Sequence, residues 1–134
     1  EMRRLKREFG TAIILITHDL GVVAELADSV AVMYAGSIVE MGSIADIFEH
    51  SAHPYTHALL QSVPRLSRDS SPLKPVQGQP PSLLNLPDCC AFLPRCPQAG
   101  DVCLKVKPQL QALASNHLVA CCRARVESQE VMLA

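Results

Sequence analysis

Six cysteine side chains are the residues of this chain best suited to chemistry. All of them lie in its last third, at Cys89, Cys90, Cys96, Cys103, Cys121 and Cys122. Residues 1–9 form a charged, amphipathic helical pattern rather than an export signal, and disulfides are rare in proteins that remain in the cytosol. We therefore expect these thiols to bind a metal ion or an iron–sulfur cluster.

The spacing of the cysteines leaves two kinds of metal site open. Zinc sites usually contain cysteines about two to four residues apart, whereas five residues separate Cys90 from Cys96 and six separate Cys96 from Cys103. Loops of this length also fit a larger group, and four thiolates suffice for a [4Fe–4S] cluster. Few aliphatic residues surround the cysteines, so a bound metal would supply much of the folding energy of this region.

His18 is the second candidate for chemistry. It follows residues 11–17, a short run rich in branched aliphatic side chains, which predicts a strand buried on both faces of a parallel sheet. Ligands of open α/β sheets bind beyond the carboxyl ends of such strands. A single histidine after a strand is nevertheless more often structural, so position alone does not make His18 functional.

His53 and His57 lie four residues apart in a predicted helix. No third ligand and no general-base glutamate accompany them, so they do not form the zinc-protease motif. We expect no metal at this pair.

The elements around His18 follow an α/β pattern. Asp19 is placed to cap a helix that runs to about Ala27, and residues 30–34 predict a second buried strand. A strand, a helix and a strand in this order predict a parallel βαβ crossover. Residues 35–36 then predict a turn into a hairpin strand over residues 37–41.

Two further helices and a proline-rich segment follow. Ser43 and Asp46 resemble a capping box that opens a short helix, and Pro54 suits the first turn of a second helix that ends before Pro64. Repeated prolines over residues 65–88 predict an extended linker. We therefore divide the chain into residues 1–50, a helical segment 51–64, the linker 65–88 and a small, cysteine-rich, loop-rich domain 89–134.

Composition excludes several classes of protein. The chain has 134 residues, 49% of them hydrophobic, and a net charge of −1. These values fit neither a disordered polar tail nor a basic nucleic-acid-binding protein. No apolar run approaches the roughly 18 residues that span a bilayer.

Three motifs resemble one known family. The strand ending in Thr-His-Asp at residues 17–19 is similar to the histidine switch of ATP-binding-cassette (ABC) ATPases, and the resemblance continues through residues 27–33 and 36–42. The string His-Pro-Tyr-Thr at residues 53–56, followed by Ala-Leu-Leu at 58–60, looks like the segment after the ATPase core in ATP-binding subunits of oligopeptide and dipeptide ABC importers. The cysteine pattern that begins at Cys90 is similar to that of their C-terminal domain.

The resemblance implies a fold and a role for His18. Residues 1–50 would be the C-terminal part of an ABC nucleotide-binding domain that binds ATP with Mg²⁺. His18 would be catalytic and would contact the ATP γ-phosphate. The sequence contains no Gly-x-x-x-x-Gly-Lys-Ser/Thr loop, so we expect a fragment of a longer subunit, inactive as an ATPase by itself.

The resemblance also favours a cluster over zinc, because members of the family can hold a [4Fe–4S] cluster in this domain. The ligands would be Cys90, Cys96, Cys103 and Cys121, with zinc as the alternative. Cys89 and Cys122 depart from the pattern, and we expect them to be spare thiols. Three cations lie near these cysteines in the sequence and would offset the charge of a cluster, although ordinary surface charge explains them equally simply: Arg95, Lys105 and Arg123.

The function implied is that of a peptide ABC transporter subunit that couples ATP hydrolysis to translocation across the cytoplasmic membrane. Its partners would be the transmembrane permease subunits and a second ATPase subunit, and it would lie on the cytoplasmic face of the membrane. No nucleic acid is expected as a partner. The alternative is a non-catalytic metal-binding or iron–sulfur interaction module from a truncated gene.

Overall fold

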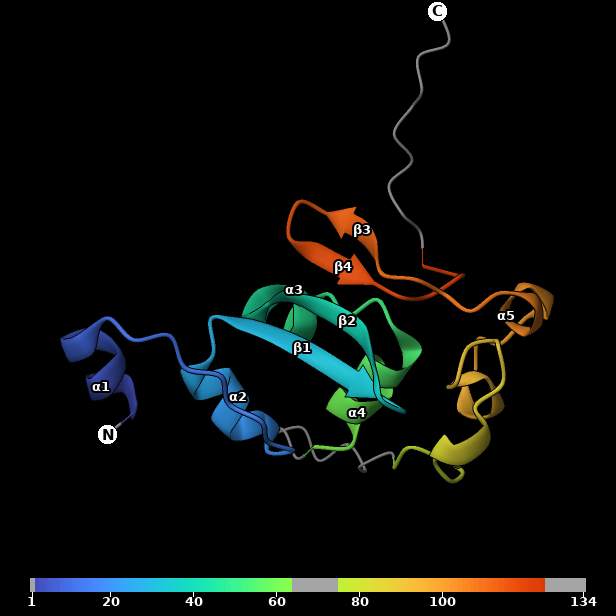
Figure 1. The fold of residues 1–134 in the computed structure, drawn as a ribbon, viewed down its shortest axis with the longest axis horizontal. Coiled ribbons are helices and arrows are strands. Elements are labelled where there is room, and N and C mark those ends of the chain that lie inside the picture. The colour runs from blue at the N-terminus through green and yellow to red at the C-terminus, as the bar shows by residue number, and fades with distance from the viewer. Residues whose placement is uncertain (1, 64–74, 125–134) are drawn as a thin grey trace, which may run out of the picture.

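A computed structural model describes residues 2–63 and 75–124. Its helices are α1 Met2–Phe9, α2 Leu20–Leu26, α3 Ile44–Glu49, α4 Pro54–Gln61 and α5 Asp101–Lys105, with 3-10 helices η1 Leu83–Asn85 and η2 Leu93–Arg95. Its strands are β1 Ser29–Tyr34, β2 Ser37–Ser43, β3 Gln111–Ala114 and β4 His117–Val119 (Figure 1). No described helix is both long and apolar enough to cross a membrane.

Strands from both ends of the chain form one antiparallel sheet, in the order β1-β2-β4-β3 (Figure 1). β1 and β2 form the predicted hairpin. Its turn uses Ala35 and Gly36, both with positive φ, which suits the right-handed twist of a two-residue hairpin loop. β4 then pairs with β2 through Glu40 opposite Val119 and Met41 opposite Leu118. The cysteine-rich region therefore extends the sheet that the N-terminal hairpin begins.

The predicted parallel βαβ crossover is wrong for the part of the chain that the structure describes. Every strand pair there is antiparallel, and residues 11–17 form no strand. The side chains of Ile14 and Ile16 are 92% and 94% exposed. A parallel strand requires a hydrogen-bonding neighbour and cover on both faces, and the described residues supply neither to this segment.

The structure confirms the predicted helix starts. Asp19 caps α2 by accepting hydrogen bonds from the backbone amides of Gly21 and Val22. Ser43 and Asp46 form both bonds of a capping box at α3. Pro54 occupies the first turn of α4. These signals depend on neighbouring residues only, so they hold although the predicted sheet does not.

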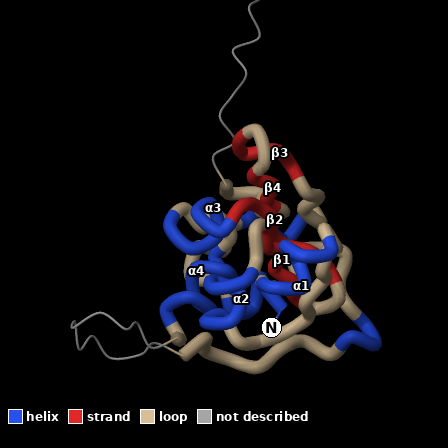
Figure 2. The backbone as a smooth tube through the Cα atoms, turned by 90° about the vertical axis from the view of Figure 1, so that its left-hand side faces the viewer, coloured by secondary structure: helices blue, strands red, loops and turns tan. Residues whose placement is uncertain are grey.

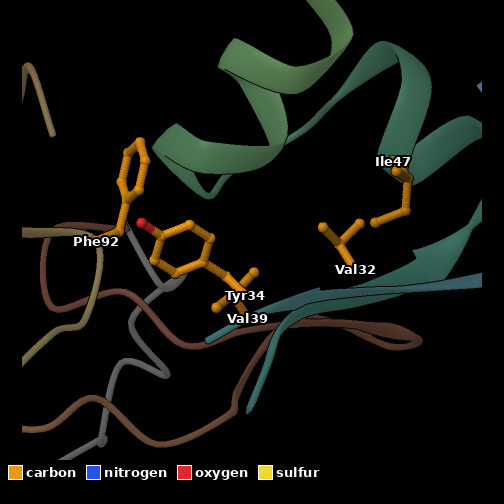
Figure 3. Close-up of a cluster of buried hydrophobic side chains, with 5 residues drawn as sticks. All are labelled: Val32, Tyr34, Val39, Ile47 and Phe92. Carbon is orange, nitrogen blue, oxygen red and sulfur yellow. The ribbon is translucent and has the colours of Figure 1, made fainter. Parts of the chain in front are cut away.

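The core joins the hairpin to the cysteine-rich region. Its five buried side chains are Val32, Tyr34, Val39, Ile47 and Phe92 (Figure 3). Helices α3 and α4 lie over the same face of the hairpin (Figures 2 and 3). Phe92 reaches this core from the loop after Cys90, and its ring meets that of Tyr34 edge-on at a centroid distance of 5.3 Å. Burial of a large aromatic ring here fixes the cysteine loops against the sheet.

Candidate functional site

The four predicted ligands Cys90, Cys96, Cys103 and Cys121 line one cavity, and Cys122, predicted as a spare thiol, lines it as well. They reach it from separate elements: Cys90 precedes η2, Cys96 follows η2, Cys103 lies in α5 and Cys121 follows β4. Pro54, Phe92 and Leu93 supply apolar wall. The fold thus brings together thiols that are up to 31 positions apart in the sequence.

Short backbone hydrogen bonds hold these cysteines in turns. Leu93 N–H donates to Cys90 O at 3.0 Å, Cys96 N–H donates to Leu93 O at 3.2 Å, and Cys103 N–H donates to Gly100 O at 2.9 Å. The cysteine-rich region, which has few aliphatic residues, therefore gains local order from its turns. The positions of the thiols are set by backbone geometry as well as by Phe92.

Burial raises the pKa of the Cys90 and Cys96 thiols, and the neighbouring thiols of the cavity raise them further. Arg123, which also lines the cavity, acts in the opposite direction on the pKa of Cys96. The metal-free Cys90 and Cys96 thiols consequently hold their protons more strongly, and a bound metal would have to displace them.

No group of three or more histidine, cysteine, aspartate or glutamate side chains surrounds a single metal-ion position in the residues that the structure covers. The thiols share a cavity without converging on one point. A closed tetrahedral zinc site would bring four donors to about 2.0–2.3 Å from one ion. In a [4Fe–4S] cluster four thiolates are the ligands of a larger body, and the donor set present fits that requirement.

The three cations named with the cysteines have different roles. Arg123 lines the cavity, and the Cβ of any side chain at Gly100 would lie 2.8 Å from its Nη1. Arg95 is engaged elsewhere: it donates to the carbonyl oxygens of Val76 and Gln77 and to the hydroxyl of Tyr34. Lys105 is not among the lining residues. Only Arg123 therefore stands where it could offset charge on the thiolates.

Glu40 is a fully buried carboxylate beside this cavity region, and sequence reasoning missed it. It accepts hydrogen bonds from the backbone amides of Ala52 and His53, at 2.6 and 3.1 Å. Its Oε1 also lies 2.7 Å from Nε2 of His117, which is 3% exposed. The sequence gives no signal for this burial, because an acidic residue between Val39 and Met41 in a strand would by alternation face solvent.

His53 contributes its imidazole to the same region. The ring is 1% exposed and lines the cysteine cavity, and its Nδ1 accepts the Tyr55 amide N–H at 3.0 Å, which caps α4. Burial lowers the pKa of His53 to about 4, so the ring is neutral at physiological pH. His57, its neighbour one turn along, is exposed and has Nε2 2.8 Å from Gln61 Nε2.

Comparison with known proteins shows what this chain is similar to. Residues 39–103 match the family model described as the C-terminal region of the oligopeptide/dipeptide transporter. The chain is 49% identical over 120 residues to the oligopeptide transport ATP-binding protein OppD of Salmonella typhimurium, with 90% of this chain and 36% of that protein aligned. The OppD of Escherichia coli is 48% identical over 120 residues, with 90% and 35% aligned.

The dipeptide transport ATP-binding protein DppD of Bacillus subtilis is 47% identical over 119 residues, with 89% of this chain and 36% of that protein aligned. This chain is homologous to the C-terminal region of oligopeptide and dipeptide transport ATP-binding proteins. It spans about a third of the length of the OppD and DppD proteins that it matches. The matched residues 39–103 contain Glu40, His53 and three of the four predicted ligands.

His18 lies outside the region matched by the OppD/DppD family model, in the bend between residues 11–17 and α2, and is exposed. The two residues beside His18 have structural roles. Thr17 Oγ1 accepts the Asp19 amide N–H at 3.0 Å, and Asp19 caps α2. Within the described residues, the His18 ring forms no hydrogen bond, so it is presented to solvent from a fixed helix start.

Proposed function

We propose that this chain is part of an ATP-binding subunit of a peptide ABC transporter. In this role the subunit couples ATP hydrolysis to the translocation of peptides across the cytoplasmic membrane. The OppD and DppD relatives are named as transport ATP-binding proteins, and their 47–49% identity over nine-tenths of this chain supports the proposal. The partners are permease subunits and a second ATPase subunit, which place the subunit on the cytoplasmic face of the membrane.

His18 is the residue of this chain that would contact nucleotide. Phosphoryl transfer needs donors around the γ-phosphate and the attacking water more than it needs covalent help. An exposed imidazole beside a capped helix start can donate one hydrogen bond to a γ-phosphate oxygen of ATP bound with Mg²⁺. Such a contact reports whether the γ-phosphate is present, which suits a switch between two states of the subunit.

The cavity thiols form the second part of the proposal. Cys90, Cys96, Cys103 and Cys121 would hold a [4Fe–4S] cluster, which supplies a rigid cross-link between loops and a one-electron centre. The observation that supports this assignment is that Cys90, Cys96, Cys103 and Cys121 line one cavity although they come from separate elements, with Cys122 as a fifth thiol in its wall. Zinc is the alternative. Its binding would require the thiols to move toward a single point.

Metal analysis of the chain after anaerobic purification tests the assignment. We expect four irons and four sulfides per chain, by the definition of the cluster, and broad visible absorption that bleaches on reduction. One zinc per chain without sulfide would establish the alternative. A chain that binds neither iron nor zinc would refute a metal site.

Cysteine variants separate ligands from spare thiols. Cys103→Ser removes a buried thiol of the cavity and should abolish cluster binding. Cys89→Ser is the matched control, because Cys89 is next to a predicted ligand but is not among the residues that line the cavity. Equal loss of iron in both variants would contradict the ligand set.

A further inference from the structure

The His53 imidazole has two nitrogens in different surroundings. Nδ1 accepts the Tyr55 amide N–H at 3.0 Å, so it carries no proton. In a neutral imidazole the proton must then lie on Nε2, which makes Nε2 a hydrogen-bond donor. The ring is packed at a centroid distance of 6.0 Å from Phe92 and is 1% exposed, so its orientation is held by the core.

The Nε2–H donor of His53 has no acceptor within the residues that the structure describes. The ring nevertheless lines the cavity of Cys90, Cys96, Cys103 and Cys121. The donor is therefore available to an acceptor held in this cavity. The natural acceptor in this cavity is sulfur, either of a ligand thiolate or of the group that the thiolates hold.

A helix cap alone does not explain a histidine here. Asparagine, aspartate, serine and threonine are the usual N-cap residues and require less buried volume. Position 53 instead has a ring whose first nitrogen caps α4 and whose second nitrogen is free to donate. The backbone amide of His53 also donates to Glu40 Oε2 at 3.1 Å, which anchors the residue to β2.

We propose that His53 is a positioning residue of the metal centre, whose Nε2–H donates a hydrogen bond to sulfur in the cysteine cavity and raises the reduction potential of the bound cluster. The inference rests on the proposed [4Fe–4S] site. Hydrogen bonds to sulfur withdraw electron density from a cluster and are one of the factors that set its potential. His53 would thereby connect the helical segment at residues 51–64 with the electronic state of the cysteine-rich domain.

The variant His53→Asn tests this assignment, because asparagine keeps a cap acceptor for the Tyr55 amide but cannot place the same donor in the cavity. His57→Asn is the matched control on the same helix, since His57 is exposed. The readout is the midpoint potential of the loaded chain in a mediated redox titration followed by electron paramagnetic resonance. We expect a lower midpoint potential for His53→Asn than for the wild-type chain, an unchanged potential for His57→Asn, and equal iron and sulfide contents in all three.

A measurement on the wild-type chain decides the matter if His53→Asn does not fold. Electron–nuclear double resonance of the reduced chain, with ¹⁵N-labelled histidine, should give a histidine nitrogen coupling and an exchangeable proton coupling that persist in His57→Asn. Absence of these couplings, or an unchanged potential in a folded, fully loaded His53→Asn chain, would overturn the role of His53 and leave the cluster assignment intact. A wild-type chain that binds no iron and sulfide would overturn both.

Discussion

Glu40 and His117 are hydrogen-bonded in the interior although 77 positions separate them in the sequence: Oε1 of Glu40 lies 2.7 Å from Nε2 of His117. The same carboxylate accepts the amides of Ala52 and His53. One fully buried side chain therefore joins β2, the segment before α4 and the β3–β4 hairpin. The cysteine-rich region is attached to the rest of the chain by this contact as well as by Phe92.

The variant Glu40→Ala should strongly destabilise the chain. It leaves two backbone donors and the His117 ring buried without their acceptor, and each buried group left unsatisfied costs about 1–3 kcal/mol. Equilibrium unfolding in urea of the full chain measures the change. Glu49→Ala is the control, because Glu49 is exposed at the end of α3, and it should alter the free energy of unfolding by less than about 0.5 kcal/mol. Equal stability of the two variants would show that Glu40 is not a structural junction.

Structural features that depend on neighbouring residues could be predicted from the sequence, whereas features that depend on distant partners could not. The Asp19 cap, the Ser43–Asp46 capping box and the proline at the start of α4 each depend on a few neighbouring residues, and the structure confirms them. The strand over residues 11–17 was predicted from apolar composition alone. A strand also needs partners, and the described residues provide none, so Ile14 and Ile16 are exposed instead of buried.

In the candidate site, too, some features could be predicted from the sequence and the long-range contacts could not. The resemblance to the peptide-importer ATPases implied which thiols belong together, and the structure places all four predicted ligands in one cavity. Spacing could not reveal His53, because a histidine before a proline gives no sign that its ring will be buried beside cysteines nearly 40 to 70 positions away. Nor could it reveal the Glu40–His117 contact, which depends on the pairing of β2 with β4.

The variant Arg95→Ala should release the segment around Val76 and Gln77 from the core. Arg95 donates to the carbonyl oxygens of both residues, at 3.1 and 2.8 Å, and to the Tyr34 hydroxyl at 3.2 Å. Its guanidinium also lies 5.9 Å from the centroids of the Tyr34 and Phe92 rings. Loss of these contacts should cost about 1–3 kcal/mol and accelerate amide hydrogen exchange over residues 75–80.

Arg4→Ala provides the comparison for Arg95→Ala. Arg4 forms an exposed pair with Glu8 one helical turn away, at 3.0 Å, and such pairs contribute about 0.3–0.5 kcal/mol. Its replacement should leave exchange over residues 75–80 unchanged. If both variants behave alike in this segment, Arg95 does not anchor it.

The metal-free chain should lose stability in mild acid because of His53. Burial lowers the pKa of His53 from 6.5 to about 4, so between these values the unfolded chain binds a proton that the folded chain does not. Stability from this group is complete above about pH 6.5, is lost progressively as the pH falls from there to about 4, and does not fall further below that. The loss amounts to about 3 kcal/mol at about 1.4 kcal/mol per pKa unit.

The comparison that isolates this effect is the difference in unfolding free energy between pH 7 and pH 4 for the wild-type chain and for His53→Asn. Asp46, whose pKa is lowered by its hydrogen bonds to Ser43, titrates in both chains and cancels in the comparison. His53→Asn should therefore have the smaller loss of stability. Parallel pH profiles would mean that the ring is not buried as a neutral imidazole.

The variant His18→Ala should nearly abolish ATP hydrolysis in a subunit that contains this chain together with the nucleotide-binding segments of its relatives. The ring is exposed at a capped helix start, and Thr17 and Asp19 hold the backbone on either side of it. Removal of the imidazole should leave those caps and the fold intact, so the expected result is an unchanged affinity for ATP and a turnover reduced by at least about a hundredfold, as for loss of one essential transition-state donor. Glu25→Ala, a change in the same helix α2, serves as the control and should hydrolyse ATP at the normal rate. Normal turnover in His18→Ala, or a matching loss of ATP affinity, would assign the residue a role other than sensing the γ-phosphate.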